Sequence, residues 1–233
     1  MKKILYSTLL VCGLLSFAGC EDITTEDTSK VTYFIDFNMA GDKVMNVVVG
    51  TGFTDPGVTA KEGAQDVTSS MVIEGTVNPN EVGAYKITYS AKNVDGFSSS
   101  VTRLVYVYDP SAADLSGTYT VQGGSYRLTL SGGAQVPYAG YPITITKFLP
   151  GFYNISDFFG GYYEGYRGYG SDYAMTGSFA LKVDNTIGYI SSTNKGWSDS
   201  MDGVTGSYDP ATGVFSLAAT YAGSYTFNII IKK

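Results

Sequence analysis

The residues with the most distinctive chemistry lie between positions 138 and 173, where one residue in three is aromatic and glycine is frequent. The stretch FFGGYYEGYRGYGSDY at 158–173 is the densest part. Its rings keep neither to one face of a strand nor to one stripe of a helix, so the pattern predicts a loop or a pair of loops. Tyrosine gives a rigid, amphipathic contact surface and glycine lets the backbone conform to a ligand, a combination that binding loops use.

These residue types suit the recognition of a sugar or another hydroxylated ligand. A flat ring stacks on the C–H face of a sugar, while phenol groups, Arg167 and Glu164 can bond to hydroxyl groups. The sole tryptophan lies in the polar turn NKGWSDS and offers a second stacking platform. The candidate ligand-binding residues are therefore Tyr162, Tyr163, Tyr166, Arg167, Tyr169 and Trp197.

Packing inside the protein explains the same pattern. The rings of 138–173 would then plug the mouth of a barrel or lie against the N-terminal domain, and Trp197 would pack locally. Self-association through the rings is a third hypothesis. The sequence leaves these alternatives open, because it does not show which rings reach solvent.

The chain lacks the commonest acid–base side chain of enzymes near neutral pH. It contains no histidine, which removes His-based zinc sites, Ser-His-Asp triads and Cys-His pairs. No G-x-S-x-G motif, phosphate-binding glycine motif or positioned pair of carboxylates is recognisable. The segments SDSMDG, with Asp199 and Asp202, and NVDG, with Asn93 and Asp95, lack the alternating ligands of a calcium loop and favour plain turns. We therefore predict a non-enzymatic protein without catalytic residues, metal or cofactor.

Alternating hydrophobic side chains predict strands throughout the body of the chain. Residues 85–91 place two tyrosines, Ile87 and Ala91 on one face, and residues 103–108 alternate in the same way with a second apolar face. Turn clusters such as Asp55-Pro56-Gly57 separate such runs. No convincing helical stripe follows the first twenty residues. Short strands with turn signals about every 8–12 residues indicate an all-β fold.

Residues 31–109 are expected to form the first domain. The segments VVVGTGFTDPGVTA and EVGAYKITYSAKNVDGFSSSVTRLVYVYD resemble the bacterial Ig-like domains of surface proteins. In that family a G-x-x-F-x-D-P-G-x-x-A segment precedes a G-x-Y-x-V-x-Y-x-A strand, a D-G turn and an R-x-V-x-V strand. The resemblance implies a β-sandwich used as a spacer or adhesion module, with Tyr85 and Tyr89 in the core and no ligand site.

Residues 110–114 are expected to be a linker and residues 115–233 a second domain. Four strand openings recur there, each with a glycine and a hydroxyl residue before an aromatic: LSGTYTV, MTGSFAL, VTGSYDP and YAGSYTF. The glycines allow close backbone approach or a bulge, and the rings are expected to point inward. The regular spacing predicts an antiparallel β-barrel of about eight strands, with an open sandwich as the alternative. The segments DLSGTY and GSYDPATGVFSLAATY resemble the C-terminal lipocalin-like domains of Bacteroidetes lipoproteins.

Residues 1–19 are expected to be a signal peptide. Lys2 and Lys3 precede an apolar stretch that is too short to span a bilayer, and LSFAGC ends this stretch at Cys20. The arrangement resembles a bacterial lipobox, which implies that Cys20 is acylated and becomes the first residue of the mature protein. An ordinary secretory signal that is cleaved elsewhere is the alternative.

Residues 20–30 are expected to be a solvated acidic tether, with four carboxylates at Glu21, Asp22, Glu26 and Asp27. Acidic residues directly behind the lipidated cysteine resemble the surface-export signal of Bacteroidetes lipoproteins. This resemblance implies a lipid-anchored protein of the outer membrane, exposed at the cell surface. A tether that faces the periplasm is the alternative.

The net charge of −6 at pH 7 argues against a nucleic-acid partner and against electrostatic adhesion to anionic lipid. Membrane attachment is therefore expected through the acyl groups on Cys20. The sequence predicts a non-enzymatic, lipid-anchored cell-envelope protein that binds a glycan or another extracellular ligand through the aromatic loops of its C-terminal domain. The alternative is a structural or adhesion subunit that binds a protein partner of an outer-membrane complex.

Overall fold

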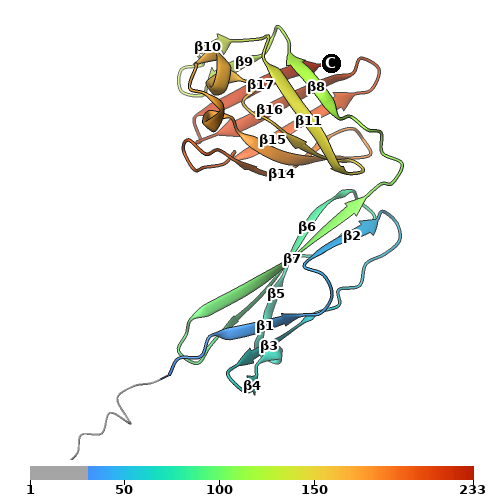
Figure 1. Ribbon diagram of the computed structural model, residues 1–233, viewed down its shortest axis with the longest axis vertical. Helices are drawn as coiled ribbons and strands as arrows, with labels where there is room; N and C mark the ends of the chain where they lie inside the picture. Colours follow the sequence, from blue (N-terminus) through green and yellow to red (C-terminus); the bar gives the residue numbers. More distant parts are fainter. Residues whose placement is uncertain (1–30) are drawn as a thin grey trace, which may run out of the picture.

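Two β-rich domains follow each other along the chain in the computed structural model, which describes residues 31–233 (Figure 1). The predicted signal peptide 1–19, the acylation of Cys20 and the acidic tether 20–30 lie outside the described residues. Within 31–233, helical structure is confined to short turns, and no helix is long and apolar enough to cross a membrane. The all-β fold class is confirmed.

The N-terminal domain packs two sheets against each other, as an Ig-like sandwich does (Figure 1). The first sheet has the order β1-β3-β4 and consists of β1 (Ile35–Met39), β3 (Val58–Glu62) and β4 (Gln65–Asp66). The second has the order β2-β7-β6-β5 and consists of β2 (Val44–Val48), β5 (Val72–Glu74), β6 (Gly83–Lys92) and β7 (Ser98–Tyr108). A 3-10 turn, η3 (Thr68–Ser70), lies between β4 and β5. The two runs predicted from alternation are the central strands β6 and β7.

An ion pair between a buried arginine and a partly exposed aspartate joins the two sheets of this domain. Arg103 on β7 is fully buried, and its Nε atom lies 3.0 Å from Oδ1 of Asp55 in the turn before β3. The guanidinium group also donates to the carbonyl oxygens of Ala40 (2.7 Å) and Gly57 (3.2 Å). The hydroxyl group of Tyr89 donates to the other carboxylate oxygen of Asp55. The aspartate, tyrosine and arginine of the Ig-like motif thus meet in one polar contact, which the alternation pattern alone does not reveal.

The C-terminal domain is a single curled antiparallel sheet. Its strands are β8 (Gly117–Val121), β9 (Tyr126–Thr129), β10 (Gln135–Pro137), β11 (Pro142–Leu149), β12 (Phe152–Ile155), β13 (Thr176–Leu181), β14 (Ile187–Thr193), β15 (Gly203–Asp209), β16 (Val214–Tyr221) and β17 (Tyr225–Lys232). β17 pairs with β16, β8 and β9, which curls the sheet round its core. β14 and β15 meet at an isolated bridge between Thr186 and Ser207, so the barrel is only partly closed at this seam. Of the two predicted architectures, the barrel is the closer description.

Two of the recurring glycines permit the close strand approach that the sequence predicts. A Cβ atom at Gly177 would lie 2.4 Å from the carbonyl oxygen of Ser191, and one at Gly206 would lie 2.2 Å from that of Ser216. Of the associated rings, Tyr119 and Phe179 are fully buried in the barrel core, while those of the third and fourth openings are half-buried beside it.

The two domains contact each other beyond the linker. Tyr106 of β7 packs edge-on against Phe148 and Phe152 of the barrel, with centroid distances of 5.6 and 5.1 Å. Lys182 and Glu81 form an ion pair across the same boundary at 2.7 Å. The linker therefore joins two domains that pack against each other.

Replacing Arg103 by methionine removes the cation of this pair and leaves the Asp55 carboxylate without it. We expect the N-terminal domain to lose roughly 1–3 kcal/mol of unfolding free energy, less than for a fully buried pair, because the Asp55 side chain is 26% exposed and stays partly hydrated. Calorimetry would report the N-terminal transition, while Trp197 fluorescence reports only the C-terminal domain because it is the sole tryptophan. Lys86→Met, at an exposed position of β6, is the matched control. An unchanged N-terminal transition in Arg103→Met would contradict a stabilising role for the pair.

Candidate functional site

The aromatic segment 158–173 connects β12 to β13 at one end of the barrel (Figure 1). Where the sequence predicts an irregular loop, the structure contains one π-helical turn, η4 (Tyr162–Tyr166), and one 3-10 turn, η5 (Ser171–Tyr173). Gly161 precedes η4 with φ 76°, and a Cβ atom there would lie 2.4 Å from Cβ of Tyr141. Glycine thus lets the turn pack directly onto Tyr141, a long-range contact that the local pattern does not encode.

One buried carboxylate holds both ends of this loop. Asp157 is 2% exposed and accepts hydrogen bonds from the backbone N–H groups of Phe159 (2.8 Å), Gly161 (2.7 Å) and Met175 (2.8 Å). The first two donors lie where the loop leaves β12 and the third lies where it enters β13. Burial raises the pKa of the Asp157 carboxyl group to about 6, although the three N–H donors favour its charged form.

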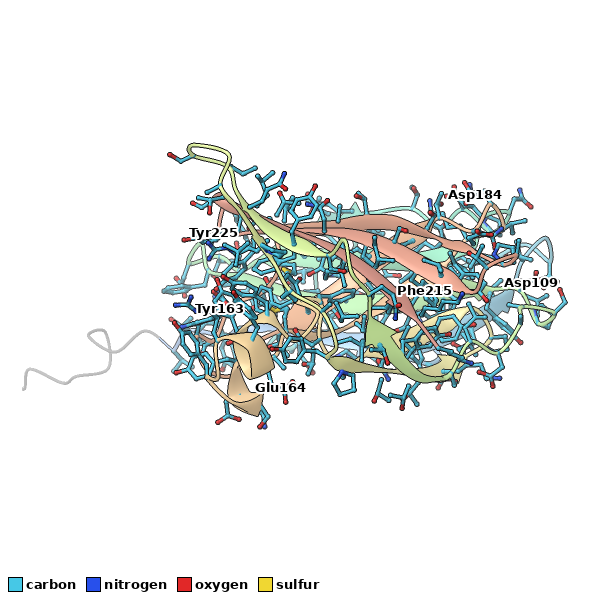
Figure 2. The ribbon with its side chains drawn as sticks, turned by 90° about the horizontal axis from the view of Figure 1, so that it is seen from above. Asp109, Tyr163, Glu164, Asp184, Phe215 and Tyr225 are labelled. Carbon is cyan, nitrogen blue, oxygen red and sulfur yellow. The ribbon has the colours of Figure 1, made fainter. Side chains whose placement is uncertain are left out.

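Two of the predicted ligand-binding residues are part of the barrel packing. Tyr162 and Tyr163 are 1% and 8% exposed and lie against Phe227, with centroid distances of 5.5 and 5.8 Å. Figure 2 places Tyr163 and Tyr225 at one end of the barrel, away from Asp109 and Asp184. The structure therefore corrects the sequence-based set, because rings this deeply buried do not present a face to a ligand.

The next turn of the loop brings rings to the surface. Tyr166 and Tyr169 are exposed, and Arg167 between them is exposed as well. Tyr166 stacks on Tyr162 at 5.3 Å, and Tyr169 stacks on Tyr163 at 5.8 Å. Each exposed ring thus lies on a buried ring, which fixes its orientation before any ligand arrives.

Trp197 joins the same surface from the connection between β14 and β15. It is 38% exposed, and its ring meets those of Tyr163 and Tyr173 at 4.8 and 4.9 Å. The buried side chain of Asn194 accepts the N–H of Trp197 at 2.8 Å and donates to the carbonyl oxygen of Ala174 at 3.2 Å. This amide ties the two connections together. We call Tyr166, Arg167, Tyr169, Tyr173 and Trp197 the aromatic surface.

Arg127 on β9 supports this end of the barrel, a role that sequence reasoning missed. Its guanidinium carbon lies 5.1 Å from the ring centroid of Tyr162 and 4.8 Å from that of Tyr225. Burial raises the pKa of Tyr163, and the nearby Arg127 opposes this shift. An arginine in a strand that reads RLTL gives no local signal of such a contact.

A groove of about 600 Å³ runs over the outer face of β11 to β14. Short polar side chains line it in two rows, and each row crosses the four strands. The first row consists of Thr146, Asn154, Ser178 and Ser191. The second row consists of Thr144, Ser156, Thr176 and Thr193. No charged side chain is among the residues that line it. We call this feature the hydroxyl groove. Its signal in the sequence is the alternation of Ser and Thr with apolar residues along these strands.

The hydroxyl groove adjoins the connections that carry the aromatic surface. Ser156 directly precedes Asp157, Thr176 directly follows Met175, and Thr193 directly precedes Asn194. This second row, which we call the border row, therefore lies at the end of the strands from which the two connections with the aromatic surface leave.

The acidic segments compared with calcium loops have structural partners. Asp199 accepts the hydroxyl group of Tyr221 at 2.6 Å, and Asp202 accepts the backbone N–H of Gly223 at 2.8 Å. Asn93 accepts the N–H of Phe97 at 2.8 Å. Within residues 31–233, no three His, Cys, Asp or Glu side chains gather as a metal site would require.

Both domains match known families. The model for the bacterial surface protein Ig-like domain matches residues 37–107, and a second model, for a C-terminal domain, matches residues 108–233. A solved structure, that of the lipoprotein BT2262 from Bacteroides thetaiotaomicron, is 42% identical, covers 86% of this chain and 100% of its own, and has a TM-score of 0.49. The chain belongs to the BT2262 family. The predicted resemblance to Bacteroidetes lipoproteins with an Ig-like domain is confirmed.

A second solved structure is much less similar to this chain. The structure of CBM51-2 in complex with GlcNAc and INT domains from Clostridium perfringens ZmpB is 14% identical, with a TM-score of 0.28. It covers 52% of this chain and 29% of its own, a likeness that supports no assignment. No curated protein matches this chain.

The raised pKa of Asp157 predicts a pH dependence of stability. The folded-state pKa, about 6, lies above the unfolded value of about 3.9, so the folded domain binds this proton more tightly. The stabilisation is complete below pH of about 4 and is lost as the pH rises through about 6, a change of roughly 3 kcal/mol. Because most of the decline lies between pH of about 4 and about 6, urea unfolding followed by Trp197 fluorescence at pH 4, 5, 6 and 7 should show it.

Asp157→Asn should remove that slope, because the amide does not titrate. Asp184→Asn is the control, since the pKa of the exposed Asp184 is lowered by its bonds to Thr186 and its titration lies below this range. A slope that is identical in Asp157→Asn and in the unaltered protein would assign the pH dependence to other groups.

Proposed function

We propose that this protein is a non-enzymatic, lipid-anchored binding protein of the cell envelope whose aromatic surface takes a neutral glycan chain. The observation that carries the proposal is the stacking of exposed Tyr166 and Tyr169 on buried tyrosines. Rings held in place before binding lose little freedom when a ligand arrives, so more of the contact energy is retained as affinity. Trp197 adds a third ring at an angle to them.

The hydroxyl groove extends this platform. Its lining offers hydroxyl groups and one amide, and a neutral polyhydroxylated chain can exchange hydrogen bonds with both. An anionic ligand would find no cation in the groove, because no charged residue lines it. A glycan whose end stacks on the aromatic surface could continue over the border row into the groove.

Three observations support the envelope location. The chain belongs to the family of a Bacteroides lipoprotein, its N-terminal domain matches the Ig-like domain of bacterial surface proteins, and its sequence resembles a lipobox at Cys20. Acidic residues behind Cys20 favour the outer membrane and the cell surface within that location.

Alanine at Tyr166 or Tyr169 should weaken glycan binding by roughly 1–3 kcal/mol each, in the range of binding hot spots. The melting temperature should change little, because these rings are exposed. Tyr163→Ala is the contrasting variant: it opens a cavity and should cost about 3–5 kcal/mol of stability. Affinity electrophoresis in gels that contain neutral polysaccharides measures the first effect, and thermal unfolding the second.

The two measurements separate the hypotheses. A large drop in melting temperature for Tyr166→Ala and Tyr169→Ala would assign these rings to packing and exclude the aromatic surface as a recognition site. Co-purification of an envelope protein that depends on the same rings, without retardation by any polysaccharide, would favour the structural or adhesion subunit instead.

Changing Cys20 to serine should move the protein from the membrane fraction to the soluble envelope fraction or stop its processing, because the acyl anchor is lost. Immunoblots of fractionated cells provide the measurement. Unaltered membrane fractionation of Cys20→Ser would remove the anchoring proposal.

Surface exposure is tested separately, with a protease added to intact cells. A surface-exposed protein should be degraded there, whereas a protein that is degraded only after cell lysis lies on the periplasmic side.

A further inference from the structure

An exposed apolar patch lies at the end of the N-terminal domain farthest from the barrel (Figure 1). Tyr33, Phe34, Val94 and Phe97 form it, and we call it the apolar tip. These side chains are 56%, 62%, 77% and 53% exposed, and the rings of Phe34 and Phe97 lie 5.7 Å apart. Exposed aromatic residues that gather from separate segments are unusual on a soluble surface and mark an interaction site.

The two segments of the apolar tip are held in a fixed position relative to each other by the buried amide of Asn93. Asn93 is 5% exposed, donates through Nδ2 to the carbonyl oxygen of Tyr33 at 2.8 Å and accepts the N–H of Phe97 at 2.8 Å. The turn that follows is held from the other side, where the carboxylate of Glu62 accepts the N–H of Val94. The N-terminal segment and the turn between β6 and β7 are thereby locked to each other.

The position of the tip identifies what can reach it. The described chain begins at Val31, two residues before the tip, and ten residues separate Val31 from Cys20. Such a chain spans at most about 35 Å when fully extended. If Cys20 is acylated, as proposed above, the tip is the part of the described molecule that is held next to the bilayer.

We propose that the apolar tip inserts into the interfacial region of the membrane that carries the anchor, so that the N-terminal domain stands on the bilayer through two contacts. The inference rests on the proposed anchoring. Tyrosine and phenylalanine suit this layer, where an apolar ring meets lipid tails and a polar group stays hydrated.

The size of the patch favours a lipid surface over a second copy of the chain. Four side chains fall well short of the roughly 1,200–2,000 Å² that stable protein interfaces bury. A tethered surface has no such requirement, because the anchor supplies a local concentration in the millimolar range and weak insertion is then sufficient.

Vesicle flotation of the chain from Glu21 to Lys233 tests the insertion without the anchor. The lipid concentration is several millimolar, so that it matches the local concentration that the anchor would supply. This chain contains every described residue and lacks Cys20, so its result is independent of acylation and of glycan binding. The vesicles contain phosphatidylethanolamine and phosphatidylglycerol at a ratio of about 3:1, with phosphatidylcholine vesicles beside them. We expect weak flotation with both compositions that resists added salt, because the contact is apolar and not electrostatic.

Phe34→Ser with Phe97→Ser should lower the partition coefficient at least tenfold, whereas Phe34→Leu with Phe97→Leu should largely keep it. Val72→Ser with Ile73→Ser, an equally exposed apolar pair on the edge strand β5, is the matched control and should float like the unaltered chain. Equal thermal unfolding of all variants confirms their fold. Absence of flotation, or equal flotation of the serine and control pairs, overturns the proposal. A concentration-dependent dimer that the serine pair abolishes assigns the tip to a second copy and overturns it as well.

Discussion

The candidate site depends on one buried carboxylate. Asp157 takes three backbone N–H groups from the two ends of a long connection, and it does so at a depth where burial resists its charge. These bonds fix the start and the end of the connection between β12 and β13. The π-helical turn, the stacked tyrosines and the tyrosine that contacts Trp197 lie between the two ends that this side chain holds.

Packing and recognition appear in the sequence as competing explanations of one aromatic segment, but the structure assigns them to different residues of it. Tyr162 and Tyr163 complete the barrel core, and Tyr166 and Tyr169, a turn later, lie on them. The buried pair is therefore the support of the exposed pair. This arrangement needs two aromatic residues for each exposed ring, because every exposed ring stacks on a buried one.

Patterns of short range were sufficient to predict the all-β class and the close approach at Gly177 and Gly206. Contacts between distant segments were not predictable in this way. The burial of Tyr162 depends on strand β17, and the role of Arg103 depends on a turn some fifty positions earlier. The hydroxyl groove exists only because four strands bring their outer faces into register. Alternation in the sequence predicts the sheet face on which a side chain lies, but not the residues of other strands that it contacts.

The course of β7 has a mechanical consequence. This strand runs from the turn at the far end of the N-terminal domain to the boundary with the barrel, pairing with β6 on one side and with β2 on the other (Figure 1). A pull between the N-terminal end of the chain and a ligand on the barrel acts along these strands and not across them. A force along the strands loads their hydrogen bonds in shear. The bonds then share the force and must break together, not one after another. The N-terminal domain is therefore built as a strut, and its resistance to such a pull comes from the hydrogen bonds on either side of a single strand.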